Sequence, residues 1–398
     1  MTDLRIESAA AVGDLADRWS PLATSLYSSA DWLATSESPA ITRRYLILSH
    51  RDGDGPGEPA ALVATSRIDQ PGGWIFGDPI ALLLGLAGAP EQSFAPQAAR
   101  RLSRLREGLT PDDLYPATLC ALSSGYLPGI VTAPGAPAAD VAAALTQVER
   151  QAAEWVTKST SVLYVPERDR ILRAALAGRG YLAFTPLAEC VLPVAGWTAF
   201  EDYLASLRSA RRNSVRHEIA AFDASGATFA EVSVHALGQG HAGLHIEHMR
   251  GYGHELAADR ILSLFGTIGD LFADTATVIE LREDDALLGF LLIYHDRGWV
   301  YPKMLGLCPS AQRPPYAYFN LGYYETIRYA IRTGRAGIIF GPEAYEVKAL
   351  RGIWPEPRTI FLRPPAGTRD QVAAVVGVLD EAHRHRFAAY PWRARTAT

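Results

Sequence analysis

Three consecutive extended segments in the second half of the chain, followed by a helix and one more buried segment, restrict the fold most strongly. Residues 276–282, 286–294 and 298–305 are apolar runs separated by short breaks, which predicts an antiparallel meander. Residues 318–333 then have helical spacing up to Gly334, and residues 338–340 form a buried strand. A strand, a helix and a strand in this order predict a βαβ unit, so we expect a mixed sheet with helices on both faces.

The remainder of the second half supplies the helices and one more strand. A helix is expected from about residue 199 to 222, because Thr198 and Glu201 have the spacing of a capping box. Further segments complete the prediction: a strand at 227–233, helices at 241–257 and 259–273, a loop at 341–352, a strand at 358–362 and a final helix at 368–386.

The first half has a similar layout of helices and extended runs. The segments YLILS (45–49) and AALVATS (60–66) flank a stretch dense in turn residues, which predicts a β-hairpin. The other expected elements are a strand at 74–76, loops at 88–98 and 131–139, helices at 141–157 and 168–177, a strand at 161–165 and an extended segment at 182–192.

Length and composition indicate two globular domains. A chain of 398 residues exceeds one ordinary core, so we expect domains at 1–192 and 193–398, with the last helix able to pack back on the first. The net charge of -5 gives no overall attraction for DNA or for an anionic membrane. The longest apolar run, 80–89, is about half the length of a membrane helix and is predicted to be buried core. Three isolated cysteines and no evident signal peptide favour a cytoplasmic protein.

The segment GPEAYEVKALRG (341–352) carries one of only three lysines, beside 35 arginines. It follows the last strand of the βαβ unit and gathers Glu343, Tyr345, Lys348 and Arg351. Acyl transfer needs a proton acceptor and a positive group for the developing oxyanion, and a partly buried lysine can supply that charge. A charged loop on a solvated face is the alternative. Lys303, on the preceding strand, brings a second lysine to the same sheet.

The step from the third strand of the meander into its helix is a candidate anion site. Tyr301 and Lys303 lie on the strand, and Tyr316 lies at the helix start, where backbone N–H groups can bind a phosphate. The stretch QRPPYA (312–317) is similar to the pyrophosphate loop of GNAT acyltransferases, with Pro315 at a glycine position. A rigid turn before a helix is the other interpretation.

The segment LASLRSARRNSVRHEIAAF (204–222) carries an arginine stripe. Arg208, Arg212 and Arg216 recur every four residues, with Arg211 beside them and no acid between them. Such a stripe repels itself unless it binds phosphates or a carboxylate, or pairs with acids elsewhere in the fold.

Five histidines lie between residues 235 and 254, and His241 and His245 have the i,i+4 spacing of metal-binding helices. The segment has no H-E-x-x-H pattern and no nearby cysteine, so we expect no metal site and a polar cleft instead. The absence of G-x-S-x-G, P-loop and G-x-G-x-x-G motifs argues against a serine hydrolase, an NTPase and a Rossmann enzyme.

Two blocks carry a family resemblance. FEDYLASLRSARRNSVRHEIAAF (200–222) resembles the arginine-rich helix of Fem-type N-acyltransferases, and YFNLGYYETIRYAIRTG followed by GPEAYEVKALRGIWP looks like the second signature of predicted peptidoglycan biosynthesis/recognition acyltransferases. The resemblance covers residues 198–363 and implies two tandem GNAT-like domains. It implies that Lys348 polarises the carbonyl under attack, and that Arg211, Arg212 and Arg216 face a phosphate-bearing substrate.

The resemblance and the residues together predict an acyl- or aminoacyltransferase. We expect an amide product rather than an ester, no tightly bound cofactor, and either aminoacyl-tRNA or acyl-CoA as co-substrate. The acceptor is a small molecule or a cell-wall precursor, because the long helical arm of bridge-forming Fem proteins is absent from residues 241–273. The alternatives are a non-catalytic module that recognises a peptide or glycan and, more distantly, a metal-dependent hydrolase.

Overall fold

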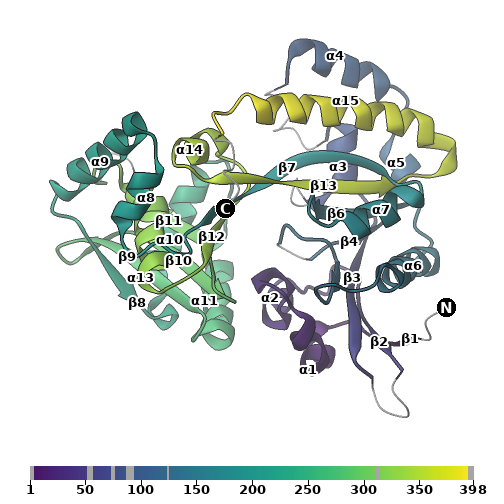
Figure 1. Ribbon diagram of the computed structural model, residues 1–398, viewed down its shortest axis with the longest axis horizontal. Coiled ribbons are helices and arrows are strands. Elements are labelled where there is room, and N and C mark those ends of the chain that lie inside the picture. Colours follow the sequence, from purple (N-terminus) through teal and green to yellow (C-terminus); the bar gives the residue numbers. More distant parts are fainter. Residues whose placement is uncertain are drawn as a thin grey trace. The chain divides into compact units, whose positions relative to one another are not determined.

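The computed structural model describes residues 4–51, 57–72, 77–86, 94–122, 125–309 and 313–392. The chain forms two compact units (Figure 1). The first unit comprises Met1–Glu189 and Glu356–Pro391, and the second comprises Cys190–Pro355 and Trp392–Thr398. Strand β7 (Leu182–Pro193) runs out of the first unit into the second. None of the helices in these described ranges has the length and apolarity needed to cross a membrane.

The first unit is built on a mixed sheet with the strand order β1-β2-β3-β4-β6-β13-β7. Strands β2 and β3 form the predicted antiparallel hairpin, and β4 and β6 are the parallel pair. The short strand β5 adds to β3. The strand bounds are β1 Leu4–Ala9, β2 Arg43–His50, β3 Pro59–Ile68, β4 Ala117–Cys120, β5 Ile130–Thr132, β6 Ser159–Pro166 and β13 Trp354–Arg363.

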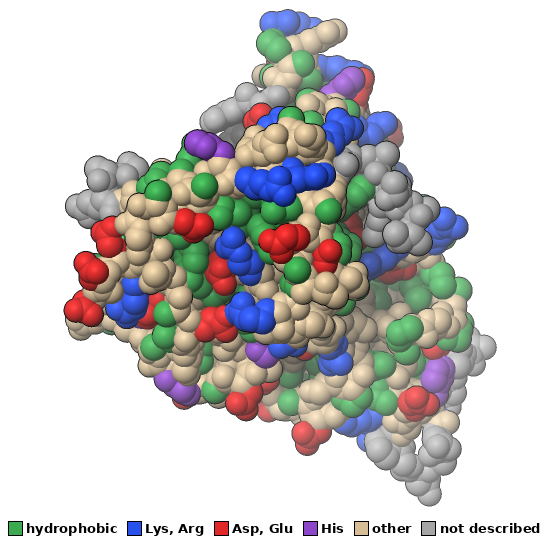
Figure 2. Space-filling model, turned by 60° about the vertical axis from the view of Figure 1, so that its left-hand side comes forward, with side chains coloured by type: hydrophobic (Ala, Val, Ile, Leu, Met, Phe, Trp, Pro, Cys, Tyr) green, Lys and Arg blue, Asp and Glu red, His purple; other side chains and the backbone are tan. Residues whose placement is uncertain are grey.

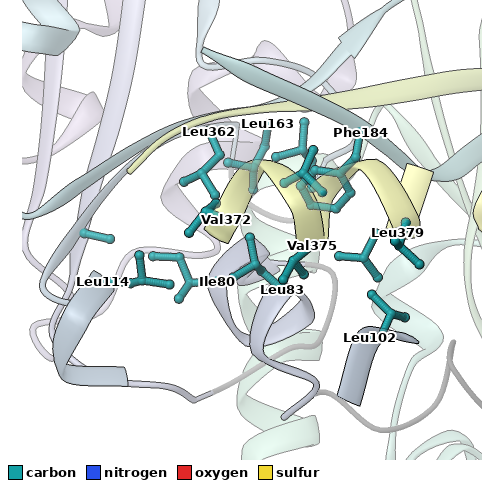
Figure 3. Packing of buried hydrophobic residues seen from close by; sticks show 14 of the residues in the cluster. Ile80, Leu83, Leu102, Leu114, Leu163, Phe184, Leu362, Val372, Val375 and Leu379 are labelled. Carbon is teal, nitrogen blue, oxygen red and sulfur yellow. The ribbon is translucent and has the colours of Figure 1, made fainter. Parts of the chain in front are cut away.

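Helices cover both faces of this sheet. Consecutive residues of β13 alternate between two cores, with Ile360 and Leu362 in one and Phe361 in the other. The first core joins the sheet to α3, α4 and α15 (Figure 3), and the second joins it to α6 and α7. The helix bounds are α1 Ala16–Trp19, α2 Ala30–Ala34, α3 Pro79–Leu84, α4 Pro96–Leu105, α5 Pro111–Leu114, α6 Ala138–Glu154, α7 Arg170–Gly178 and α15 Arg369–Ala388.

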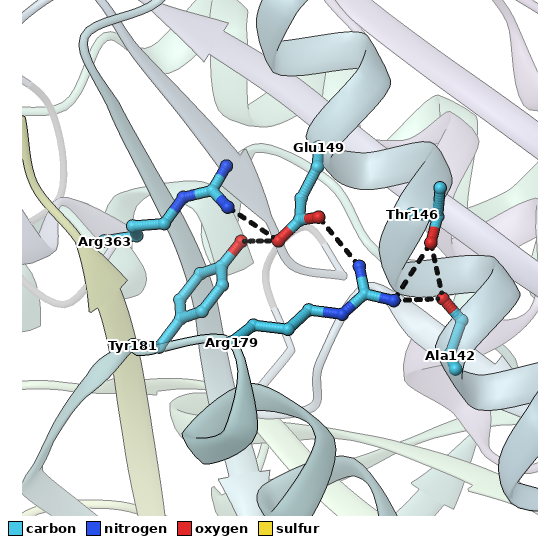
Figure 4. Close-up of polar contacts among 6 residues, drawn as sticks. All are labelled: Ala142, Thr146, Glu149, Arg179, Tyr181 and Arg363. Atoms are coloured by element: carbon cyan, nitrogen blue, oxygen red, sulfur yellow. Dashed lines mark hydrogen bonds and ion pairs between the residues drawn. The ribbon is translucent and has the colours of Figure 1, made fainter.

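One polar network ties α6 to the end of α7 and to β13 (Figure 4). The carboxylate of Glu149 accepts hydrogen bonds from Arg179 at 2.7 Å and Arg363 at 2.8 Å. The hydroxyl of Tyr181 approaches the same carboxylate at 3.4 Å. These side chains are partly exposed, so the network fixes orientation more than it adds stability.

The second unit has its own mixed sheet, in the order β7-β12-β11-β10-β9-β8. Strands β9, β10 and β11 form the predicted antiparallel meander, and β11 and β12 are the predicted parallel pair of a βαβ unit. The strand bounds are β8 Thr228–Val232, β9 Ala276–Glu283, β10 Ala286–Asp296, β11 Trp299–Leu307 and β12 Gly337–Gly341.

The helices of the second unit correct three expectations. The single helix expected at 199–222 is wrong, because Leu207 and Arg208 are extended and separate α8 (Phe200–Ser206) from α9 (Ser209–Asp223). The carboxylate of Asp202, rather than Glu201, accepts the N–H groups of Thr198 and Ala199. The loop expected at 341–352 contains helix α14 (Tyr345–Leu350).

The helix expected at 318–333 is a composite of α12 (Ala317–Phe319), a π-helix (Asn320–Glu325) and α13 (Thr326–Arg332). Helices α10 (Gln239–Arg250) and α11 (Ala258–Phe272) form the predicted pair, but the first ends at Arg250 rather than at residue 257. In the first unit, the loop expected at 131–139 contains the end of β5 and the start of α6. The strand expected at 74–76 lies outside the described residues.

Candidate active site

The parallel strands of the second unit separate soon after they meet. Only Trp299 and Val300 of β11 pair with β12, opposite Gly337 and Ile338. Pro302 follows two residues later and has no N–H group to continue the ladder. The two strands therefore diverge toward their carboxyl ends, which is where ligands bind in sheets with parallel strands.

Three hollows in the second unit have volumes of about 210, 320 and 540 Å³, and the smallest lies at this divergence. All three are bordered by His248. We call them together the splayed-strand hollow. Its smallest part reaches from Pro302 and Leu305 on β11 to Phe340 on β12 and to Lys348 on α14.

Aromatic side chains form much of the wall. Tyr323 stacks on Phe340 at a centroid distance of 5.3 Å and meets Tyr318 edge-on at 5.9 Å. Burial raises the pKa of both tyrosine hydroxyls, so they keep their protons near neutral pH. Gly322 and Tyr323 of this wall belong to the π-helix, a wide turn that is often found at functional sites.

Lys348 holds the turn that closes the inner end of the hollow. Gly341, Glu343 and Ala344 all have positive φ, and the last two are strained because L side chains disfavour that region. The ammonium group of Lys348, which is 4% exposed, donates to the carbonyls of Phe340, Gly341 and Pro342 at 3.1, 2.9 and 2.8 Å. Three donors on one atom suit three convergent carbonyls, and the planar fork of arginine does not.

The other two candidate catalytic residues share this segment. Glu343 is half-buried on the strained turn. Tyr345 is 2% exposed and packs against Trp392 at a centroid distance of 6.0 Å, so its side chain belongs to the core of the second unit.

Arg351 is predicted to bind substrate and is instead the centre of a buried network. Its guanidinium pairs with Glu218 of α9 at 2.7 Å and lies 3.8 Å from the centroid of Phe319. Glu218 also accepts the hydroxyl of Tyr324 from the π-helix. The network joins α9, the π-helix and the end of α14, and so supports the wall of the hollow.

The arginine stripe divides into two kinds of residue. Arg212 donates to the carbonyls of Leu204 at 2.9 Å and Leu207 at 3.1 Å, and so caps the end of α8. Arg208, Arg211 and Arg216 are exposed and form no ion pair within the described part of the chain. Positive and negative side chains are interspersed on the face drawn in Figure 2, so this face carries no patch of one sign.

The three residues of the predicted anion site, Tyr301, Lys303 and Tyr316, differ in how exposed their side chains are. Tyr301 is 1% exposed and belongs to the core. Lys303 is half-buried at the point where the register of β11 against β10 shifts. Tyr316 is 39% exposed, has a positive φ, and borders the hollow together with Arg313. Gln312, the first residue of the predicted pyrophosphate loop at 312–317, lies outside the described residues.

One of the five histidines between residues 235 and 254, His248, borders the hollow although the sequence did not single it out. His241 pairs with the buried carboxylate of Glu280 at 2.9 Å, and Nδ1 of His245 lies 2.9 Å from the carbonyl of Leu305. His248, one turn further along α10, borders the hollow. No cluster of three or more metal-ligating side chains occurs among the described residues. The sequence signal was the i,i+4,i+7 spacing, which places all three histidines on one helix face.

Comparisons with known proteins agree with this fold. A family model for FemAB-like proteins, described as peptidoglycan biosynthesis/recognition, matches residues 114–364. No curated protein matches the chain. Solved structures with the same fold include FemX, with a TM-score of 0.58 and 12% identity over 92% of this chain and 100% of that one.

A second solved structure is the C-terminal domain of a putative lysylphosphatidylglycerol synthetase from Agrobacterium fabrum. Its TM-score is 0.53 at 12% identity, covering 93% of this chain and 96% of that one. A tandem GNAT protein from the clavulanic acid pathway gives 0.48 at 12% identity, covering 91% of this chain and 98% of that one. The predicted fold class, α/β with mixed sheets and helices, is confirmed, and FemX shares the fold over 92% of this chain.

Proposed function

Because the chain belongs to the FemAB-like family of peptidoglycan biosynthesis/recognition proteins, we propose that it is an acyltransferase that uses the splayed-strand hollow as its active site. The observation that carries the proposal is the divergence of β11 and β12 within the matched segment, which leaves a hollow lined by aromatic and cationic side chains. An acceptor amine there attacks an activated acyl or aminoacyl group and forms an amide, with an ester as the less favoured product.

The donor is an aminoacyl-tRNA or an acyl thioester, and the acceptor is a small molecule or a cell-wall precursor. Arg313 borders two parts of the hollow, and Arg208, Arg211 and Arg216 lie exposed on the surface of the same unit. Such cations favour a partner with phosphate or carboxylate groups. The resemblance gives Arg212 this role too, although its guanidinium is occupied in capping α8.

Lys348 stabilises the oxyanion in this proposal, acting through its positive charge at the inner end of the hollow. Its three bonds to backbone carbonyls hold that charge in place. Removal of the proton from the amine is predicted for Glu343 or Tyr345. Neither residue borders the three hollows, and Tyr345 is buried, so both are weak candidates for this step.

The test is mass spectrometry of products formed from charged tRNA pools or acyl-CoA pools with candidate amines. We expect a new amide with the wild type and a drop in kcat of about a hundredfold or more for Lys348→Ala. Lys348→Arg keeps the charge but cannot match the three carbonyls, so we expect intermediate turnover. Turnover by Lys348→Ala equal to that of wild type would refute the catalytic role of Lys348.

The donor is identified by the same reactions at increasing salt. A tRNA donor predicts a steep fall of kcat/KM with salt, and Arg211→Gln should reduce that slope by about one counterion. An acyl-CoA donor predicts saturable binding of free CoA and a shallow salt dependence.

The family description also includes recognition, so a binding module for a peptide or glycan is the second candidate function. It predicts saturable binding of a cell-wall fragment without turnover of any donor. In that case Lys348→Ala would change the Kd alone.

A further inference from the structure

His248 stands where the parts of the hollow meet. It lies in the last turn of α10, is half-buried, and borders all three hollows. Its ring meets Tyr252 edge-on at a centroid distance of 5.3 Å. Within residues 4–309 and 313–392, as far as they are described, neither ring nitrogen hydrogen-bonds to another residue. The imidazole is therefore available to a bound molecule.

The helix that carries His248 is held firmly against the sheet. His241 and His245, on the same face of α10, are anchored to Glu280 and to the carbonyl of Leu305. Gly306 permits this close approach, because a Cβ at that position would stand 2.8 Å from the backbone nitrogen of His245. A side chain on so rigid a helix can be positioned accurately against a reacting group.

The other ionisable groups around the hollow are poorly suited to accept a proton. Glu247 is paired with Arg250. The ammonium of Lys348 is bound to three carbonyls. Burial raises the pKa of the Cys308 thiol and of the Tyr318 hydroxyl. The remaining ionisable groups near His248 are those of His245, Arg313 and Tyr252.

The charge state of His248 suits the role of a base. Burial, helped by the nearby His245 and Arg313, lowers the pKa of His248 to about 4. The ring is therefore neutral at pH 7, with one nitrogen lone pair free. The lowered pKa makes the ring a weaker base than free imidazole. Its proton donor here is the nitrogen of the tetrahedral adduct, which carries a positive charge and is more acidic than a free ammonium ion.

We propose that His248 is the general base of the acyl transfer, a step that rests on the proposed function. The amine nitrogen forms a bond to the carbonyl carbon of the donor, and the proton of that nitrogen passes to the free nitrogen of His248. The bond from the carbonyl carbon to the donor oxygen or sulfur then breaks, and its electron pair leaves with that atom. The imidazolium returns its proton to a leaving oxygen, or to water when the leaving group is a thiolate.

The test compares His248→Gln and His248→Ala with the control His254→Gln, whose exposed side chain lies beyond α10 and borders none of the three hollows. We expect kcat to fall about 10²- to 10⁴-fold in both His248 variants, with little change in KM or Tm, and no change in the control. Added imidazole should restore part of the turnover of His248→Ala. Hydroxylamine, a weakly basic acceptor, should be affected less than an alkylamine, because its adduct loses a proton more readily.

Each outcome has a distinct meaning. A fully active His248→Gln would overturn the role of His248 and leave the proposed function intact. A loss in His248→Ala that is the same for both acceptors and is unrelieved by imidazole would also overturn it. No turnover by the wild type with any donor would overturn the proposed function, and the role of His248 with it.

Discussion

The two units contain the same strand–helix–strand step and use it differently. In the first unit β4 pairs with β6 along four residues, from Ala117 opposite Ser159 to Cys120 opposite Val162. In the second unit β11 and β12 pair at two positions and then separate. In the first unit apolar cores cover both faces of the sheet, and its hollow of about 570 Å³ lies between α4 and α15. In the second unit a hollow lies between the two parallel strands themselves. The longer parallel pairing is suited to stability, and the divergence of β11 from β12 supports the proposal that the ligand binds beside the second pair.

Each unit also buries an arginine–carboxylate pair. In the first unit Arg358 contacts Glu189 at 2.5 Å, and both side chains are almost completely buried. In the second unit Arg351 contacts Glu218 at 2.7 Å, and Glu218 keeps the hydroxyl of Tyr324 as a further partner. The first pair has the more buried carboxylate, so it is the more costly one to break.

We therefore expect the substitution of Arg358 to lower the free energy of unfolding more than any other change considered below. Arg358→Leu leaves the carboxylate of Glu189 buried without its cation, which should lower the free energy of unfolding by about 3–5 kcal/mol. Arg351→Leu should cost about 1–3 kcal/mol. Urea denaturation measures both, and Arg168→Leu, a change at an exposed arginine 4.0 Å from Glu356, is the control. Equal losses at Arg358 and Arg351 would contradict the comparison.

A second substitution tests whether the hollow is the site. Gly322 borders its inner part, and a Cβ there would make an ordinary contact of 3.5 Å with Leu305. Gly322→Ala should be tolerated, while Gly322→Leu should fill space and lower kcat/KM about a hundredfold or more at nearly unchanged Tm. The same change at the exposed Gly266 of α11 is the matched control. Full activity of Gly322→Leu would place the site elsewhere.

The smallest expected effect concerns His383 of the first unit, whose pKa is lowered as that of His248 is in the second unit. Burial, with a further contribution from Arg386, lowers the pKa of His383 to about 3. The buried ring of His383 lies 5.0 Å from the ring of Phe94, measured between centroids. Below pH 6.5 the unfolded chain binds a proton that the folded first unit does not. Stability should therefore fall by up to about 1.4 kcal/mol for each pH unit between 6.5 and 3.

His383→Leu should flatten this pH dependence in urea denaturation at pH 7 and pH 5. His385→Gln, at an exposed position on the same helix, should leave it unchanged. An unaltered slope in His383→Leu would show that other groups cause the acid destabilisation. His248 has a similarly lowered pKa, but it faces a hollow, and for that reason we expect it to act in turnover.

Local pattern was enough to predict most strands and several helices. The hairpin of β2 and β3, the meander of β9 to β11 and the return to β12 follow from runs of apolar residues and the breaks between them. The break between α8 and α9 was missed, because no glycine or proline marks Leu207 and Arg208. Helix α14 was missed because it is one short turn that follows a strained loop.

Some residues of the candidate site could likewise be predicted from the sequence, and others could not. Lys348 could be singled out because lysine is rare in this chain, and the structure places it at the hollow. The burial of Tyr301 and Tyr345 and the pairing of Arg351 with Glu218 could not be foreseen, because these contacts join residues far apart in the sequence. His248 was one of five histidines until the packing of α10 on β11 distinguished it.

The sequence by itself determined the order of the strands and helices, the family and the residue types available for chemistry. These depend on short-range periodicity and on the motifs in residues 198–363. Only the tertiary structure decided which of those residues reach a common space. The divergence of β11 from β12, the carbonyls around Lys348 and the position of His248 depend on how distant segments pack, and local sequence does not encode that packing separately.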